Sequence, residues 1–175
     1  IKEGAKTAVV MGAGLIGLEV AIGLHERGVR TTVVEMLPQI MPVMLDADMA
    51  KGVQEMLEQK GISIMIGKGV EEFLGTDRVT GIVAGGEQIN ADLFISAFGV
   101  RANTDLAQKA GITLGETKAI KVNPRMETNV PGVYAIGDCA ECTHMITQRP
   151  ALPQLGTVAV RQGKVAGTNA AGGYA

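Results

Sequence analysis

Three glycines and one acid have the spacing of a dinucleotide-binding loop. Gly12, Gly14 and Gly17 form a Gly-x-Gly-x-x-Gly motif that follows the apolar residues 9–11 and precedes apolar residues at helical spacing. A second apolar run, over residues 31–34, ends in Glu35. This acid falls close to the offset of about 20 residues at which such loops place a carboxylate for the adenosine ribose. The pattern predicts binding of a dinucleotide, the alternative being three glycines in an ordinary turn.

Each glycine of the motif has its own task. Gly12 can adopt the backbone angles of a tight strand-to-helix turn. Gly14 has no side chain, so a pyrophosphate can approach the first helix amides, at Leu15 and Ile16. Gly17 lets the helix pack closely on the first strand. We therefore predict that these five residues bind the cofactor.

The residues around Glu35 favour NADH over NADPH. A 2′-phosphate at about 4 Å from this carboxylate would cost up to ~4 kcal/mol at an effective dielectric constant of 20. No Lys or Arg follows in the next residues, Met36, Leu37 and Pro38, and Arg30 lies at the far end of the same strand. Equal affinities for the two nucleotides would contradict this prediction.

The elements that must position these residues alternate between strand and helix. Strands are expected at 7–11, 31–35, 62–66 and 92–97, with helices at 15–27 and from Asp46, as N-cap, to Lys60. The second helix has Met49, Val53, Met56 and Leu57 on one apolar face. Short alternating segments over 70–89 predict an antiparallel β-meander. The fold class is therefore α/β, a Rossmann-like parallel sheet with an inserted antiparallel β-meander, and Gly99 follows a strand end where such folds hold ligands.

Residues 36–44 are apolar, rich in Met and twice interrupted by Pro. Flexible Met side chains can line the mouth of a cofactor site, and loop packing on the core is the equal alternative.

Composition excludes several classes of function. The 175 residues carry a formal net charge of −2, which gives no electrostatic case for nucleic acid or an anionic membrane surface. No apolar run is long enough to span a membrane. Two cysteines make a disulfide framework improbable, and a cytoplasmic location is the default expectation. The start at Ile1, directly before a nucleotide-binding strand, suggests a fragment.

The region from about residue 118 has too few strands for a sheet of its own. Strands are expected at 119–122 and 133–136, followed by Gly137 and Asp138, and a long helix at 153–169 begins with Pro153. An unpaired strand at 133–136 would be able to associate between chains.

Three stretches together resemble one enzyme family. They are Gly-Ala-Gly-Leu-Ile-Gly-Leu-Glu at 12–19, Phe-Gly-Val-Arg-Ala-Asn at 98–103, and Thr-Asn-Val-Pro-Gly-Val-Tyr-Ala-Ile-Gly-Asp-Cys-Ala at 128–140. The chain resembles the FAD-dependent pyridine nucleotide–disulfide oxidoreductases, in the branch of NADH oxidases, coenzyme A disulfide reductases and NADH-dependent ferredoxin or rubredoxin reductases. Ala102 departs from the family, which commonly has Pro there.

The resemblance implies a division of the chain. Residues 1–117 would be the NAD(H)-binding domain and residues 118–175 the C-terminal half of a split FAD-binding domain, followed in the family by a dimerising domain. The first FAD half, with its own glycine motif and redox cysteine, would be absent. The intact protein would be a homo-oligomer, and this chain alone would be inactive.

The resemblance also assigns roles to single residues. Asp138, after Gly137, resembles the acid that binds the ribityl chain of FAD; a turn or cap residue is the alternative. Glu19 resembles the glutamate beside the nicotinamide, and a solvated helix residue is the alternative. The positive end of the 153–169 helix would face the flavin.

Two cysteines have the Cys-x-x-Cys spacing of a redox pair, Cys139 and Cys142. The flanking Asp138 and Glu141 disfavour a thiolate, so a structural role is the stronger interpretation. With His144 they make three zinc ligands without a fourth. We therefore predict no metal site and no catalytic residue within this chain.

The sequence as a whole predicts the NADH-binding part of a flavoprotein oxidoreductase. The intact enzyme would move hydride from NADH to FAD and pass electrons to oxygen, a disulfide or a small redox protein. The alternatives are a stand-alone NAD-binding regulatory module and, last, an ordinary dehydrogenase with its own substrate domain.

Overall fold

The computed structural model describes residues 4–174, and the chain divides into two compact units, with the boundary in the sequence between Gly99 and Val100. The first unit contains β1 (Thr7–Met11), α1 (Leu15–His25), β2 (Arg30–Val34), α2 (Ala47–Gln59), β3 (Ser63–Met65), β4 (Val70–Leu74), β5 (Gly81–Ala84), β6 (Glu87–Asn90) and β7 (Leu93–Ser96). The second contains α3 (Asp105–Lys109), β8 (Ile120–Lys121), the 3₁₀ turn η1 (Gly137–Cys139), β9 (Ala140–Thr143), β10 (Pro150–Ala151) and α4 (Gly156–Ala170).

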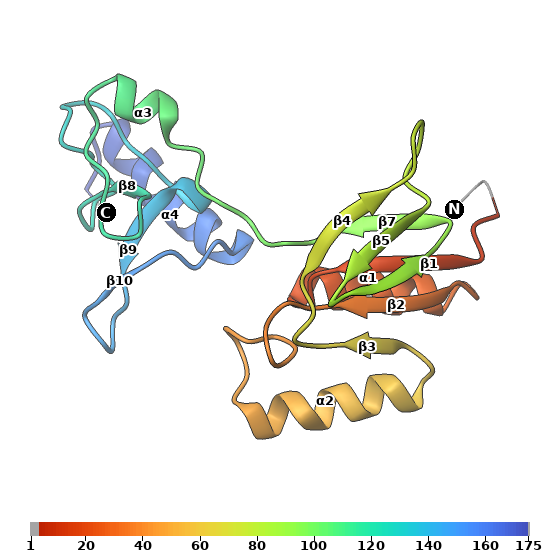
Figure 1. Ribbon diagram of the computed structural model, residues 1–175. Helices are drawn as coiled ribbons and strands as arrows, with labels where there is room; N and C mark the ends of the chain where they lie inside the picture. Colours follow the sequence, from red (N-terminus) through yellow and green to blue (C-terminus); the bar gives the residue numbers. More distant parts are fainter. Residues whose placement is uncertain (1–3, 175) are drawn as a thin grey trace. The chain divides into compact units, whose positions relative to one another are not determined.

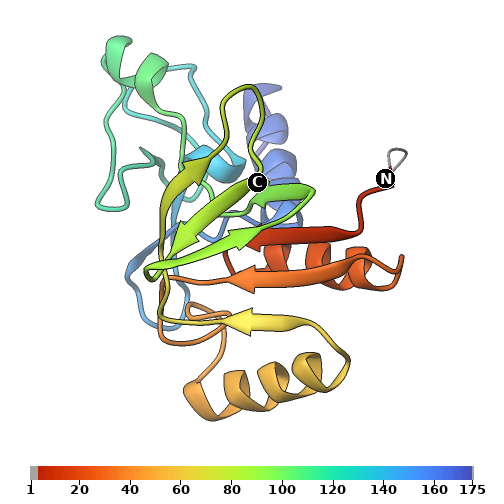
Figure 2. The same cartoon turned by 45° about the vertical axis from the view of Figure 1, so that its right-hand side comes forward.

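A four-stranded parallel sheet forms the frame of the first unit, in the order β3-β2-β1-β7. The arrowheads of β1, β2 and β3, red to yellow in Figure 2, point the same way. The carboxyl ends of all these strands therefore meet at one edge. This confirms the predicted α/β fold with a Rossmann-like parallel sheet.

Alternate residues of β1 explain why the sheet is covered on both faces. Ala8 and Val10 pack with residues of α1 and α2, whereas Val9 and Met11 pack with Ile82 of the meander. A strand buried on both faces needs apolar side chains at successive positions, as β1 has from Ala8 to Met11. The first unit thus has three layers, with helices on one face and β4-β5-β6 on the other (Figure 1).

The inserted β-meander is present as predicted. Strands β4, β5 and β6 pair antiparallel in sequence order, and Gly85 and Gly86 form the turn between β5 and β6. Ile82 and Ala84 of β5 are fully buried against the parallel sheet. The meander takes the place of a helical crossover before β7.

Helix α2 differs from the predicted packing. Asp46 occupies the N-cap position, but its side chain makes no capping hydrogen bond. Only Ala50 and Leu57 of this helix are buried, while Met49 and Met56 are 61% and 48% exposed. The helix contacts the sheet through a narrow stripe near β3, so the predicted methionine face is only partly used.

The second unit has a small core made by Ile120, Ala135 and Ala140. Ala107, Ile112 and Leu114 pack against it, so α3 and the following residues belong to this unit. The compact units therefore divide before the predicted domain boundary at residue 117. The assignment of an NAD domain and an FAD half to the two parts stays a prediction.

The predicted strand at 133–136 is wrong. These residues join no sheet; the amide of Ala135 donates to the carbonyl of Met126 at 3.1 Å, and Tyr134 makes one isolated antiparallel bridge with Glu127. The prediction that this region has too few strands for a sheet of its own is also wrong, because β9 pairs parallel with β8 and antiparallel with β10 in a three-stranded sheet. The proposed association through an unpaired 133–136 strand therefore loses its basis.

Two further outcomes concern helices. Helix α4 begins at Gly156 rather than Pro153, and the segment before it includes Gln154 at φ 50°. Among the described residues 4–174, no helix is both long and apolar enough to cross a membrane.

Candidate functional site

The glycine motif forms the turn between β1 and α1, where two of its glycines are required by the chain itself. Gly12 has φ 109°, and a Cβ there would overlap the carbonyl oxygen of Ala97. A Cβ on Gly17 would overlap the carbonyl oxygen of Gly12. These two positions therefore need glycine for the turn and for the close packing of α1.

Gly14 differs from its two neighbours in the motif. Its φ of −73° suits any residue, and a Cβ built on it would meet no heavy atom within 4 Å. Gly14 is the N-cap of α1 and has no side-chain capping bond. Nothing in the protein requires glycine here, so the space left by the missing side chain is available to a ligand.

Glu35 follows β2 and lies beside this turn. Its Oε2 accepts a hydrogen bond of 2.7 Å from the amide of Ala13, and its Oε1 accepts one of 2.8 Å from the amide of Leu37. The residue is 9% exposed. Each carboxylate oxygen has a further lone pair, so the two bonds orient the group and leave it able to accept hydroxyl donors.

Gly14 and Glu35 line one pocket of about 520 Å³ at the carboxyl ends of the parallel strands. Gly12 and Gly99 also line it, and Gly99 has φ 93°. The other lining residues are mostly apolar: Val34, Met36, Leu37, Met41, Pro42, Val43, Met44, Lys68, Gly69, Val70, Ala97 and Phe98. This is the edge at which parallel α/β sheets bind ligands.

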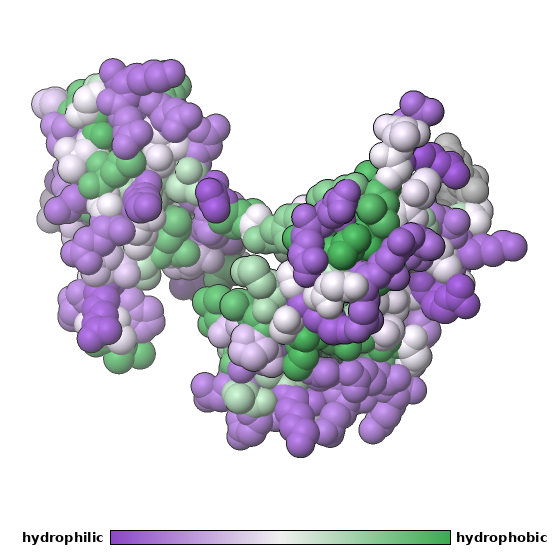
Figure 3. All heavy atoms as spheres, viewed as in Figure 1, coloured by the Kyte–Doolittle hydropathy of each residue, from purple (hydrophilic) through white to green (hydrophobic). Residues whose placement is uncertain are grey.

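The Met-rich loop, residues 36–44, packs on the core and also lines the pocket, while its role at a cofactor site stays a prediction. Ile40 is fully buried in the core, and the amide of Met41 donates to the carbonyl of Ala13 at 2.9 Å. Its neighbours remain accessible, Val43 being 94% exposed. In Figure 3 the hydrophobic atoms around this loop contrast with the hydrophilic outer surface of α2.

Three predicted residues lie on α1 outside the lining of this pocket. Leu15 and Ile16 are 42% and 60% exposed in the first turn, and Glu19 is exposed one turn later. The amides of the first turn have no partner within the helix, which is the arrangement that binds an anion.

The sequence did not identify the residues that enter the pocket from elsewhere. Lys68 follows β3, and Phe98 follows β7. The parallel sheet brings these strand ends to Glu35, because all its strands end at the same edge. Lys68 follows β3 only after Ile66 and Gly67, and no local pattern in the sequence distinguishes it from other surface lysines.

Gly137 and Asp138 lie in η1 of the second unit. Gly137 has φ 74°, and its amide donates to Oε1 of Gln162 at 2.7 Å. Gln162 is 7% exposed. The side chain of Asp138 is exposed and makes no hydrogen bond or ion pair with any described residue. The turn is therefore fixed from helix α4, and its carboxylate is free to accept hydroxyl donors.

Cys139 and Cys142 do not form a pair. The Sγ atom of Cys139 donates to the carbonyl of Ile136, and that of Cys142 to the carbonyl of Ala151, each at 3.4 Å. Both cysteines are free thiols. Across residues 4–174, no group of His, Cys, Asp and Glu has the arrangement of a metal site.

Glu141, which lies between the two cysteines in the sequence, has a structural role through hydrogen bonds to Thr117. It is 8% exposed and accepts hydrogen bonds of 2.7 Å from both the amide and the hydroxyl of Thr117. The carboxylate thereby fixes the loop before β8.

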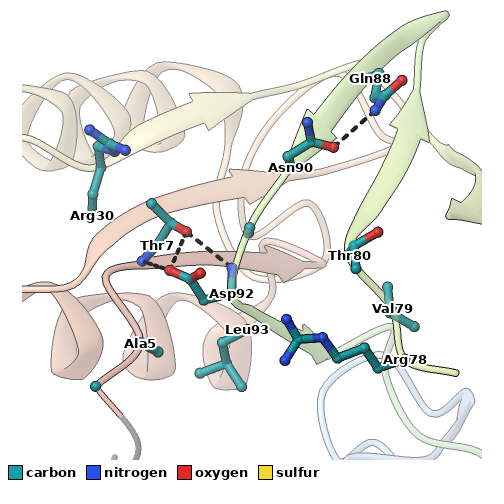
Figure 4. Close-up of a pocket in the computed structure, with 12 residues that line it drawn as sticks. Ala5, Thr7, Arg30, Arg78, Val79, Thr80, Gln88, Asn90, Asp92 and Leu93 are labelled. Carbon is teal, nitrogen blue, oxygen red and sulfur yellow. Dashed lines mark hydrogen bonds between the residues drawn. The ribbon is translucent and has the colours of Figure 1, made fainter. Parts of the chain in front are cut away.

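A larger pocket, of about 1040 Å³, lies at the opposite, amino ends of the strands (Figure 4). Thr7, Arg30 and Leu93, which begin β1, β2 and β7, line it together with Asp92. The Thr7 hydroxyl and the amides of Lys6 and Thr7 donate to Asp92 and lower the pKa of its carboxyl. None of the glycine motif lines this pocket, so its size does not make it the candidate site.

Comparison with known proteins identifies the family. The sequence model of one protein family, the pyridine nucleotide-disulphide oxidoreductases, matches residues 1–163. The chain belongs to this family. This confirms the resemblance found in the three sequence stretches.

Individual members are similar over almost the whole chain. An NADH oxidase of Methanocaldococcus jannaschii is 48% identical over 171 residues, which are 98% of this chain and 38% of that protein. The crystal structure of an FAD-dependent pyridine nucleotide-disulphide oxidoreductase from Desulfovibrio vulgaris has a TM-score of 0.94 at 38% identity, covering 99% of this chain and 44% of that one. The NAD-dependent persulfide reductase from A. fulgidus has a TM-score of 0.96 at 40% identity, covering 99% and 32%. The chain thus spans less than half the length of these family members.

Proposed function

We propose that this chain is the NADH-binding part of a flavoprotein oxidoreductase. The intact enzyme would transfer hydride from NADH to FAD and then pass electrons to oxygen, a disulfide or a small redox protein. Residues 1–117 would serve NAD(H), and residues 118–175 would supply one half of the FAD site. The names of the relatives, an NADH oxidase, an FAD-dependent oxidoreductase and an NAD-dependent persulfide reductase, support both cofactors.

The observation that carries the proposal is the joint position of Gly14 and Glu35 in one pocket. Gly14 leaves open space at the start of α1, where a pyrophosphate can reach the amides of Leu15 and Ile16. Glu35 is held by two backbone amides with lone pairs still available for the ribose hydroxyls. The exposed Met and Val side chains of the following loop would cover the adenine.

The residues of this chain would contribute mainly orientation. Glu19, on the exposed side of α1, would position the nicotinamide, and Asp138 would hold the ribityl hydroxyls of FAD. When bound, FAD supplies the two-electron acceptor that the amino acids lack. Correct placement of two reactants is by itself a large catalytic effect, worth up to about 7–11 kcal/mol.

Calorimetric titration of the chain with NADH, and then with FAD, tests the proposal. We expect NADH to bind and FAD not to bind tightly. Gly14→Ala should weaken NADH binding roughly tenfold, because a methyl group at the pyrophosphate costs about 1–3 kcal/mol and 1.4 kcal/mol is a factor of ten.

Gly52→Ala is the matched control. Gly52 lies in α2, does not line the pocket and also has open space around its Cβ position, so NADH affinity should not change. Absence of NADH binding by the unmodified chain would contradict the proposed function. Tight FAD binding would contradict the proposed division of the flavin site.

A further inference from the structure

Lys68 is the one Lys or Arg among the residues that line the 520 Å³ pocket in the described part of the chain. Its backbone amide donates to the carbonyl of Glu35 at 2.9 Å. The backbone of Lys68 is therefore hydrogen-bonded to Glu35, the residue that is expected to bind the adenosine ribose. Its charge is of the sign that attracts a phosphate.

The ammonium group of Lys68 is already paired. Its Nζ lies 2.5 Å from Oε1 of Glu87, at the start of β6. The Lys68 and Glu87 side chains are 30% and 61% exposed. The meander thus supplies a counter-charge to a cation that belongs to the pocket.

The aliphatic part of the Lys68 side chain also lies along the path toward Glu87. Its Cγ and Cδ lie 2.8 and 2.9 Å from where a Cβ on Gly85 would be. Gly85 therefore leaves room for the aliphatic part of Lys68 to cross the β5–β6 turn toward Glu87. A side chain at residue 85 would displace the lysine from this path.

We infer that Glu87 determines nucleotide specificity by acting through Lys68. The inference rests on the proposed function, since it requires the nucleotide to bind with its ribose at Glu35. Glu87 does not line the pocket and pairs with the one Lys or Arg that does among the described residues, so it would hold that ammonium back from a 2′-phosphate and add to the preference for NADH expected from Glu35. Glu87 is a positioning residue in this scheme and does not touch the nucleotide.

Removal of the Glu87 charge tests the inference. Glu87→Gln should raise the affinity for NADPH roughly two- to fivefold, the scale of one partly exposed ion pair. The affinity for NADH should rise less, because its pyrophosphate is expected at Gly14 and only NADPH has a phosphate on the ribose expected at Glu35, whose carbonyl accepts from the Lys68 amide. Both nucleotides are titrated into the same chain by calorimetry at low ionic strength, where screening is weakest.

Two further variants make the result specific. Glu72→Gln removes a carboxylate of β4 that forms no ion pair with Lys68 within residues 4–174, and should leave NADPH affinity unchanged. Lys68→Met in the Glu87→Gln background should abolish the gain. If the gain in NADPH affinity persisted with Lys68→Met, or appeared equally in Glu72→Gln, it would come from the change in net charge and not from Lys68. Either result would overturn the inference.

The outcomes separate this inference from the proposed function. If the unmodified chain binds NADH but Glu87→Gln changes neither affinity, or raises both equally, only the role of Glu87 is overturned. If the unmodified chain does not bind NADH, the proposed function fails and the inference fails with it.

Discussion

Glu35 Oε2 accepts a hydrogen bond of 2.7 Å from the amide of Ala13, which joins the end of β2 to the centre of the glycine turn. The acid is therefore a structural partner of the loop as well as a candidate ligand for ribose. Its second oxygen makes the equivalent bond to the amide of Leu37. One side chain thus fixes the geometry on both sides of the pocket.

Replacement of Glu35 by Ala should reduce both stability and NADH affinity. The two backbone amides would lose an acceptor in a buried place, which costs about 1–3 kcal/mol of unfolding free energy for each buried group left unsatisfied. Urea unfolding and calorimetric titration with NADH measure the two effects. Glu26→Ala, at the exposed end of α1, is the control and should change neither. An unchanged unfolding free energy for Glu35→Ala would contradict the structural part of this prediction.

Replacement of Gly17 by Ala should destabilise the first unit even without a ligand. The new methyl group would overlap the carbonyl oxygen of Gly12 and press on Ala97, whose Cβ is 3.4 Å away. Overpacking of this kind costs about 1–3 kcal/mol. Thermal unfolding measured by circular dichroism should show a lower Tm than that of Gly14→Ala, whose Cβ position is open. Equal Tm values for the two variants would refute the assignment of separate roles to these glycines.

Replacement of Gln162 by Leu should loosen the turn that carries Asp138. The variant leaves the amide of Gly137 without its acceptor, Gln162 Oε1. An unsatisfied, part-buried amide costs about 1–3 kcal/mol. Hydrogen exchange at the Gly137 amide should become faster, while exchange in β1 stays the same. Protection of that amide at the original level would show that another group holds the turn.

The stability of the first unit should depend on Asp92 at acidic pH. The hydroxyl of Thr7 and the amides of Lys6 and Thr7 hydrogen-bond the carboxylate and hold the pKa of Asp92 below its usual range. A depressed carboxyl pKa stabilises the fold above the unfolded value of about 3.9, and the contribution is lost as pH falls through the folded value.

Urea unfolding of Asp92→Asn across the pH range measures this contribution. The variant should be less stable than the unmodified chain at neutral pH, and the two should converge as pH falls from about 4 through the lowered pKa of Asp92. A stability difference that stayed constant down to strongly acidic pH would show that the charge of Asp92 contributes nothing.

The sequence by itself determined the dinucleotide loop and its frame. Gly12, Gly17 and Glu35 have tasks that depend on a few neighbouring residues and on one strand-turn-helix-strand unit, so their spacing was sufficient. The strand at 7–11 and the β-meander over 70–89 were likewise visible as local patterns.

The tertiary structure alone decided the contacts between distant segments. Lys68 lines the Glu35 pocket because parallel strands end at a common edge, and it meets Glu87 because the antiparallel meander places the start of β6 beside it. Gln162 meets Gly137 because α4 folds back on η1. The segment 133–136 was apolar enough for a strand, yet its hydrogen bonds go to nearby Met126 and Thr128. Hydrophobicity specifies burial, whereas the choice of hydrogen-bond partners depends on which segments the folded chain brings together.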